Sequence, residues 1–395
     1  MAYFVSQEGQ ELLEDAAKFC SQYVDAVSAE WDRGERHPTP AVAKMQELGY
    51  PMLTLPEELG GLGVTPVDVA AVLERIAYSD AGLAVSLAGN ALAVKGVMVA
   101  GNQAQKEKVA KILADGGIGA FCLTESSAGS DAFNIETKAL PTEADDGYVL
   151  NGTKLFVTNG SIADFYCVVA LEGESELPSL FLVEKGTEGF KIGPEEEKMG
   201  LRSCSTCSII LENCRVGKDA LMDRTDHKTT DADNADNRQD MTGTQAVMGA
   251  LIEGRLWISA VAIGVAQRAL DEAAAHAKER IQFGKALADH QAVRMKLADM
   301  KIQIEAARCL TEKGLNLMER GECYDEISSA AKAFAAEAVM DVTKRAMDIF
   351  GGYGYTKAYP VEKLMRDGRA FPVLEGTTEV QKMMLVNYLL QKMKW

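Results

Sequence analysis

The sequence predicts a multidomain α and β protein: an N-terminal helical domain, a middle antiparallel β domain and a C-terminal helical bundle. Apolar residues recur at helical spacing up to about residue 120 and again after residue 246. Between them, from 121 to 216, the period is two and Val, Ile, Phe and Tyr are frequent. The 395 residues, 47% hydrophobic and 25% charged, suffice for two or three folded domains. We therefore expect domains at 1–120, 121–240 and 247–395.

The first domain is expected to be helical throughout. Leu12, Leu13, Ala16 and Phe19 fall on one helix face, and a longer apolar stretch runs from Ala81 to Val99. Proline- and glycine-rich turns separate such segments at 37–40 and 56–63.

The middle domain is expected to contain strands joined by short turns. The expected strands are 147–158, 163–171, 180–185 and 207–216, and Asn151-Gly152, Asn159-Gly160 and 186–189 carry turn chemistry. The polar segment 217–246 that follows is rich in aspartate. A solvated loop is the simplest interpretation, and calcium binding is the alternative, although the spacing lacks the glycine and the final glutamate of an EF-hand.

The last domain is expected to pack long amphipathic helices. One apolar stripe contains Ile252, Leu256, Ile263 and Leu270, and two further stripes run through 293–317 and 327–349. Helices of this length with one apolar face each are what a bundle requires.

Charge and cysteine usage narrow the partners and the compartment. The net charge of −17 disfavours nucleic acid and anionic lipid, and eight scattered cysteines favour reduced thiols. The N-terminus lacks signal-peptide features, and no uninterrupted apolar run reaches about 18 residues. We expect a cytoplasmic protein with neither a nucleic-acid nor a membrane partner.

Common catalytic signatures are missing from the sequence. Cys204 and Cys207 have the spacing of half a zinc site, but no second pair follows. The four histidines lie beside no nucleophile motif, and Gly351-Gly-Tyr-Gly354 does not form a dinucleotide-binding fingerprint. We expect no metal site and neither hydrolytic nor nicotinamide chemistry.

Four segments have compositions unusual for structure alone. They are Leu123-Thr-Glu-Ser-Ser-Ala-Gly-Ser-Asp131, Phe156-Val-Thr-Asn-Gly160, Arg280-Ile-Gln-Phe-Gly284 with His290-Gln291, and Leu374-Glu-Gly-Thr-Thr-Glu-Val-Gln381. With 296–300, 349–354 and 359–367 they resemble the acyl-CoA dehydrogenase family, in the family's order and over essentially the whole chain. Within that family, the sequence resembles the short- and medium-chain branch. The implied fold has a four-helix C-terminal bundle, and the implied assembly is a homotetramer with one FAD per subunit.

The resemblance implies two sets of FAD contacts. The first lies within one subunit: Phe121, Leu123, Thr124, Gly129, Ser130, Phe156 and Thr158. The second reaches the FAD of a neighbouring subunit: Arg280, Gln282, Phe283, Gln291, Gly351 and Gly352. Thr377 and Glu379 are also expected to contact the cofactor, and Ser130, Arg255, Leu374 and Gly376 the acyl-CoA.

Glu375 matches the catalytic base of the family. It would take the α-proton of the thioester while hydride passes from Cβ to flavin N5, and an apolar site would raise its pKa toward neutrality. One branch of the family carries its base just before the first bundle arginine, but Gly254 fills that slot here. Glu253 would point about 100° away from it. Glu375 is therefore the single candidate.

The resemblance implies α,β-dehydrogenation of a short, branched or ring-bearing acyl-CoA in fatty acid metabolism, with electrons passed to electron-transfer flavoprotein. The same residues could run in reverse as an enoyl-CoA reductase, and a non-catalytic flavoprotein with a DNA-binding or assembly role is a further alternative. The charge and the intact Glu375 disfavour the latter. The acyl tail would end near 87–99, where Lys95 is expected to extend to solvent, or alternatively to cap a short pocket.

Overall fold

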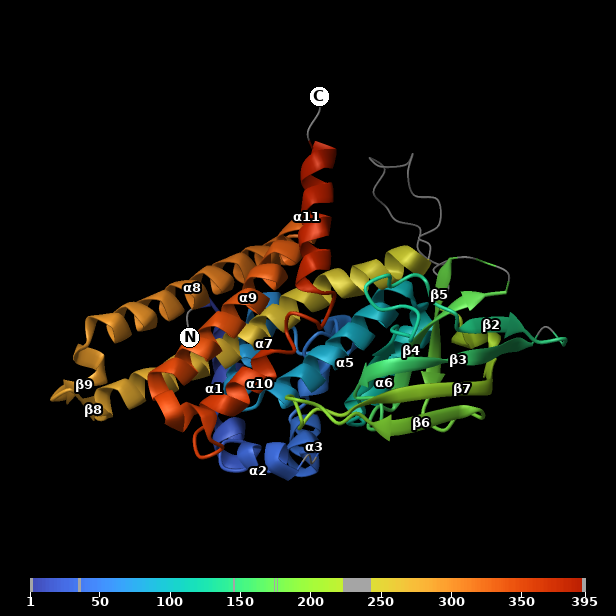
Figure 1. The fold of residues 1–395 in the computed structure, drawn as a ribbon. Coiled ribbons are helices and arrows are strands. Elements are labelled where there is room, and N and C mark those ends of the chain that lie inside the picture. The colour runs from blue at the N-terminus through green and yellow to red at the C-terminus, as the bar shows by residue number, and fades with distance from the viewer. Residues whose placement is uncertain are drawn as a thin grey trace.

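The computed structural model describes residues 3–34, 37–144, 146–173, 175, 177–222 and 243–392 of the chain. A helical domain comes first, a β-sheet follows, and long helices form the remainder (Figure 1). The expected fold class is confirmed. Most of the aspartate-rich segment 217–246 lies outside the described residues, so the calcium alternative is not addressed.

The described part of the N-terminal domain contains six α-helices, of which the fourth and the fifth are the most buried. They are α1 (Gln7–Tyr23), α2 (Ser28–Gly34), α3 (Thr39–Glu47), α4 (Pro66–Ser79), α5 (Ala81–Ala100) and α6 (Gln103–Ala114), with 3-10 turns η1 (Tyr50–Met52) and η2 (Glu57–Leu59). Thr65 and Asp68 form a capping box at the start of α4, and the Asp80 side chain caps α5. Because α5 is buried along nearly its whole length, it contacts α4, α7 and the sheet at once.

The middle domain is one seven-stranded sheet. Its strands are β1 (Gly119–Cys122), β2 (Lys138–Pro141), β3 (Gly147–Thr158), β4 (Phe165–Glu172), β5 (Pro178–Glu184), β6 (Phe190–Glu195) and β7 (Thr206–Gly217), followed by η3 (Lys218–Ala220). The order is β1-β4-β2-β3-β7-β6, and β5 pairs with the other edge of β4. Strands β1, β2 and β6 are not among the four strands expected from the sequence.

The sheet is mixed, which corrects the expectation of a purely antiparallel domain. β1 and β2 both pair with β4 in parallel, one after the other along the same edge. The reason is the excursion 123–137, which returns the chain to β4 in the direction it left instead of reversing it as a hairpin would. Asn151-Gly152, expected to be a turn, lies inside β3 at a register shift.

The C-terminal helices complete the protein. They are α7 (Gly243–Glu279), α8 (Gln291–Glu319), α9 (Asp325–Phe350), α10 (Val361–Gly368) and α11 (Thr378–Lys392), and the short elements are β8 (Ile281–Gln282), β9 (Lys285–Ala286), η5 (Leu287–Asp289) and η6 (Gly351–Tyr355). One hydrophobic core joins α1, α4 and α5 to α7, α8, α9 and α10. Figure 1 shows α11 projecting from the body and the β8–β9 hairpin at the end opposite the sheet.

Helices α5 and α7 are long and apolar enough to cross a membrane by length and composition alone. Neither helix is an uninterrupted apolar run, because Asn90 and Lys95 interrupt α5, and Glu253 and Arg255 interrupt α7. Moreover, 78% and 83% of their most apolar windows are buried inside the protein, as in the core helices of a folded domain.

Candidate active site

Glu375 lies in the segment between α10 and α11, in a strained backbone conformation. Its φ is +54°, and that of Gly376 is +86°. A positive φ strains a residue that carries a Cβ. The turn is held from both sides: the Lys332 ammonium donates to the Gly376 carbonyl at 2.5 Å, and the Gln381 amide donates to the Glu375 carbonyl at 3.1 Å.

The carboxyl group of Glu375 is directed toward the contact between α5 and α7. A Cβ placed on Gly254 would lie 3.1 Å from Glu375 Oε2 and 3.2 Å from Leu92 Cδ1. Oε2 is buried and has no hydrogen-bond partner among the described residues. The slot in which some relatives were expected to carry the base is therefore in contact with Glu375 itself, and glycine leaves room for the carboxyl group.

Burial raises the pKa of Glu375 to about 7, and the positive charges of Arg255 and Lys332 act against that rise. Arg255 is itself only 3% exposed, and its Nη1 donates to Ser329 Oγ at 3.2 Å. The sequence suggested that Arg255 would face the mouth of the site or the CoA arm. In the structure it is buried near the Glu375 carboxylate because α9 covers this face of α7, and its Nε has no hydrogen-bond partner among the described residues.

Lys332 is a charged group near Glu375 that the sequence analysis did not identify. It is 1% exposed, and burial lowers its pKa to about 8. The available signal was a lysine on the alanine-rich face of the 327–349 stripe, where a buried charge requires a partner.

The neighbouring Glu253 is held away from Glu375. Its carboxylate lies 2.6 Å from the Lys95 ammonium and accepts from Trp257 Nε1 at 3.3 Å. The expectation that Lys95 extends into solvent is therefore wrong, because a mostly buried carboxylate on α7 faces it.

The excursion after β1, which carries Leu123, Thr124, Gly129 and Ser130, is held from beneath by a buried ion pair. Lys154 Nζ lies 2.6 Å from Glu125 Oε1 and donates to the Leu123 carbonyl at 3.1 Å. Glu125 also accepts the backbone N–H of Glu136 at 2.6 Å. Gly129 and Ser130 are left exposed on the outer side, where a ligand can approach the backbone.

Phe156 and Thr158 follow on β3, next to that excursion. The Leu155 N–H donates to the Thr124 carbonyl at 2.8 Å, and the Phe156 ring is 61% exposed with φ +55°. Thr158 packs on α5 at Gly89, where a Cβ would come within 2.6 Å of Thr158 Cγ2. An exposed aromatic ring at a strained position suits a flat ligand that covers it.

The second set of predicted cofactor residues is far from the first within one chain. Arg280, Gln282 and Phe283 lie at the β8–β9 hairpin, and Gln291 begins α8 beside it (Figure 1). Phe283 is 95% exposed, and the Arg280 guanidinium stacks on Tyr353 of η6. A Cβ on Gly351 or Gly352 would meet nothing within 4 Å. This surface is open to a group that the same chain does not supply.

The remaining predicted residues flank Glu375. Leu374 packs against the helical core, and the Thr377 hydroxyl accepts the Val380 N–H at 3.3 Å. Glu379 is in the first turn of α11. Thus Arg255, Leu374, Gly376, Thr377 and Glu379 lie around Glu375, whereas the hairpin residues do not.

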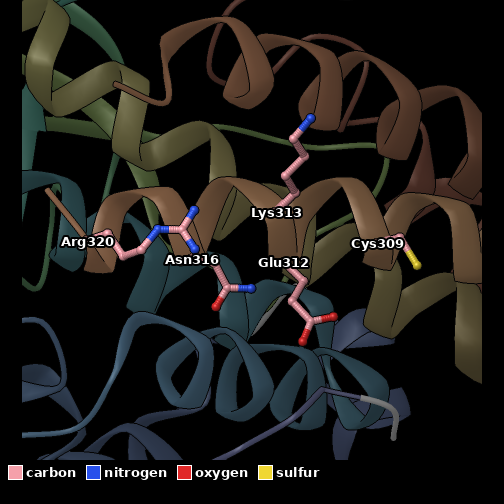
Figure 2. Close-up of a pocket in the computed structure, with 5 residues that line it drawn as sticks. All are labelled: Cys309, Glu312, Lys313, Asn316 and Arg320. Carbon is pink, nitrogen blue, oxygen red and sulfur yellow. The ribbon is translucent and has the colours of Figure 1, made fainter. Parts of the chain in front are cut away.

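Metal binding has no support in the described part of the chain, where no group of three or more His, Cys, Asp or Glu side chains could hold an ion. Cys204 and Cys207 are buried free thiols. A depression of about 320 Å³ is lined by Cys309, Glu312, Lys313, Asn316 and Arg320, whose side chains are drawn in Figure 2. Since four of these residues lie in α8 and Arg320 is its C-cap, the depression is the outer surface of one helix, and it contains none of the predicted site residues.

Three family models match consecutive parts of the chain. The N-terminal domain of acyl-CoA dehydrogenase matches residues 6–117, its middle domain 120–214 and its C-terminal domain 241–390. The chain belongs to the acyl-CoA dehydrogenase family. It is thus an oxidoreductase, and FAD is the cofactor that this family implies.

Relatives and solved structures agree with the assignment to the acyl-CoA dehydrogenase family. The probable acyl-CoA dehydrogenase FadE25 of Mycobacterium tuberculosis is 34% identical over 392 residues, 98% of this chain and 96% of the relative. Butyryl-CoA dehydrogenase of Megasphaera elsdenii has a TM-score of 0.91 at 33% identity, covering 99% of this chain and 100% of that one. A chain in a structure of the electron transferring flavoprotein of Acidaminococcus fermentans matches at 34% identity, TM-score 0.91 and the same coverage.

Proposed function

We propose that this acyl-CoA dehydrogenase converts an acyl-CoA thioester to the trans-2-enoyl-CoA with Glu375 as the base. The observation that carries the proposal is a buried, unpaired carboxyl oxygen on a group whose pKa is about 7. A base with a pKa near the working pH is available as carboxylate and can still hold the proton that it removes. No other carboxylate of the described residues occupies this position, because Glu253 is held by Lys95.

The residues around Glu375 serve the proton transfer in different ways. Leu92 and Leu374 are apolar neighbours that help to exclude water, and Gly254 leaves space beside the carboxylate. The positive charges of Arg255 and Lys332 stabilise the carboxylate before it accepts the α-proton. Bound FAD would supply the acceptor for the hydride that leaves the β-carbon. Phe121, Leu123, Thr124, Gly129, Ser130, Phe156 and Thr158 would hold this FAD.

The assembly that we propose is a homotetramer in the cytoplasm. The hairpin and η6 present Phe283, Gly351 and Gly352 to a group outside the chain, which supports contact with the FAD of a neighbouring subunit. Electron-transfer flavoprotein is the proposed electron partner, supported by the similarity to a chain in a structure of that flavoprotein.

The test is anaerobic mixing of the purified FAD protein with butyryl-, isobutyryl-, hexanoyl-, glutaryl-, phenylpropionyl- and cyclohexanoyl-CoA. At least one should bleach the flavin absorbance, and Glu375→Gln should abolish bleaching while it keeps FAD, because the amide cannot accept the proton. Glu337→Gln removes a surface carboxylate that pairs with Lys382, and it should bleach like the wild type. Bleaching at the original rate by Glu375→Gln would contradict the assignment of the base.

A further inference from the structure

Lys332 joins two features of the site that are otherwise separate, the backbone turn at Glu375 and the charge around its carboxylate. Its ammonium is almost fully buried on α9 and donates to the Gly376 carbonyl at 2.5 Å. The same ammonium is one of the two positive charges that act on the Glu375 carboxyl group. A buried ammonium is costly, so a site that keeps one needs a compensating interaction.

The turn that Lys332 contacts requires such a hold. Two successive residues, Glu375 and Gly376, have positive φ, and only the second is glycine. The Gln381 amide nitrogen donates to both carbonyls, at 3.1 and 3.3 Å, so Lys332 and Gln381 share the Gly376 oxygen. Gln381 supplies neutral hydrogen bonds, whereas Lys332 supplies a charged one, which is the stronger kind.

We propose that Lys332 is a positioning residue for the base, holding the Glu375 turn through the Gly376 carbonyl and keeping the Glu375 carboxyl group ionised through its charge. The inference rests on the proposed function of Glu375. The hydrogen bond to the Gly376 carbonyl fixes where the carboxylate points. The positive charge sets the fraction of Glu375 that is ionised and can accept a proton. Gln381 also holds the turn by hydrogen bonds, but it is neutral and does not affect the ionisation of Glu375.

In the part of the chain that the structure describes, few charged groups act on Lys332 and Glu375. Lys332 faces Glu375, Arg255 of α7 and Glu379 of α11. Glu375 faces Arg255 and Lys332. Arg255 also faces Asp325 and Tyr388. Removing Lys332 therefore leaves Arg255 as the single positive charge acting on Glu375 among the described residues, and the pKa of Glu375 rises.

The experiment measures the first-order rate of flavin bleaching against pH, with the acyl-CoA that bleaches the wild-type holoprotein. Loss of one nearby opposite charge moves a carboxyl pKa by about 1–3 units. The rate should rise with pH to a plateau, and the midpoint of the rise reports the pKa of Glu375. In Lys332→Met, a pKa about one unit higher lowers the rate about fivefold near pH 7. The loss of the hydrogen bond to the Gly376 carbonyl lowers the plateau rate about tenfold further. Lys332→Arg keeps the positive charge, so the midpoint of its rate-against-pH curve should match that of the wild type.

Two further variants separate charge from position. Gln381→Leu removes neutral donors to the same carbonyls and should lower the plateau without moving the midpoint. Lys344→Met removes an exposed lysine from the same helix and should change neither. If Lys332→Met loses FAD, Lys332→Gln, also neutral, takes its place in the same measurement.

A readout that does not use the flavin follows the carboxyl group directly. In urea unfolding, the difference in unfolding free energy between Glu375→Gln and its parent should keep growing to a higher pH in the Lys332→Met background than in the wild-type background. The proposal would be overturned if Lys332→Met or Lys332→Gln folded and its rate-against-pH curve kept the wild-type midpoint. It would also be overturned if neither variant folded, because Lys332 would then serve stability. Absence of bleaching in the wild type would instead refute the proposed function.

Discussion

At the scale of single residues, Glu375 combines conditions that usually exclude one another: it is ionisable, and its Oε2 is buried without a hydrogen-bond partner among the described residues. Burial favours its neutral form, whereas Arg255 and Lys332 favour the carboxylate. The balance places the pKa near 7, so both protonation states are available. A group in this condition favours function at the expense of stability.

The pH dependence of folding should reveal this balance. The pKa of Glu375 rises from an ordinary 4.5 in the unfolded chain to about 7 in the folded one. The folded state binds more protons between these values, so this contribution is complete below pH 4.5 and is lost as pH rises through 7. In denaturant titrations, the free energy of unfolding of Glu375→Gln should therefore increase relative to that of the wild type as pH rises, by about 3 kcal/mol at most. A pH-independent difference would contradict the raised pKa.

At the scale of elements, the excursion 123–137 depends on β3 for its shape. Lys154 of β3 is fully buried and neutralises Glu125, which in turn binds backbone N–H groups of the returning chain. The excursion also determines the parallel pairing of β1 and β2 with β4. One ion pair thus supports both the sheet and the surface proposed to bind FAD.

Lys154→Met should destabilise the protein by about 3–5 kcal/mol, because it leaves the Glu125 carboxylate buried without its cation. The double variant Lys154→Met/Glu125→Gln should recover much of this loss, since no uncompensated charge remains. Chemical unfolding measures the stability, and fluorescence titration with FAD should show weaker binding in the single variant. A single variant as stable as the wild type would show that the pair supports nothing.

At the scale of the whole molecule, buried charges connect the parts of the chain. Lys363 of α10 lies 2.8 Å from Asp367 and 3.3 Å from Asp80, the cap of α5. Asp80 accepts from Ser203, and Asp367 accepts the Leu201 N–H, so the segment after β6 joins the same cluster. The cluster anchors α10 shortly before the segment that carries Glu375.

Helix α11 leaves apolar side chains without cover in the single chain, and we expect a second subunit to bury them. Met383, Val386, Leu389 and Leu390 are each more than half exposed. Leu389→Glu combined with Val386→Glu should lower the mass of the proposed homotetramer, because charges would be buried in an apolar interface. Light scattering measures the mass, and Lys344→Glu on the exposed face of α9 is the control. An unchanged mass would place the interface elsewhere.

The sequence by itself determined the order of domains and the family, because periodicity, composition and ordered motifs are local properties that one chain displays in full. It also indicated Glu375 as the single candidate base, which remains a prediction. The sequence predicted four of the seven strands of the main sheet within two residues, for example 147–158 for β3. It could not predict the parallel pairing of β1 and β2, because strand direction depends on where a long connection returns.

Only the tertiary structure decided the surroundings of Glu375. Lys332 and Arg255 are distant in sequence from it, and only the packing of α7 against α9 places both charges at the same carboxylate. The Lys95–Glu253 pair was missed for the same reason: a lysine in an apolar helix extends to solvent unless another element buries a carboxylate opposite it. Desolvation and long-range charge depend on what surrounds a side chain in space, which no local pattern records.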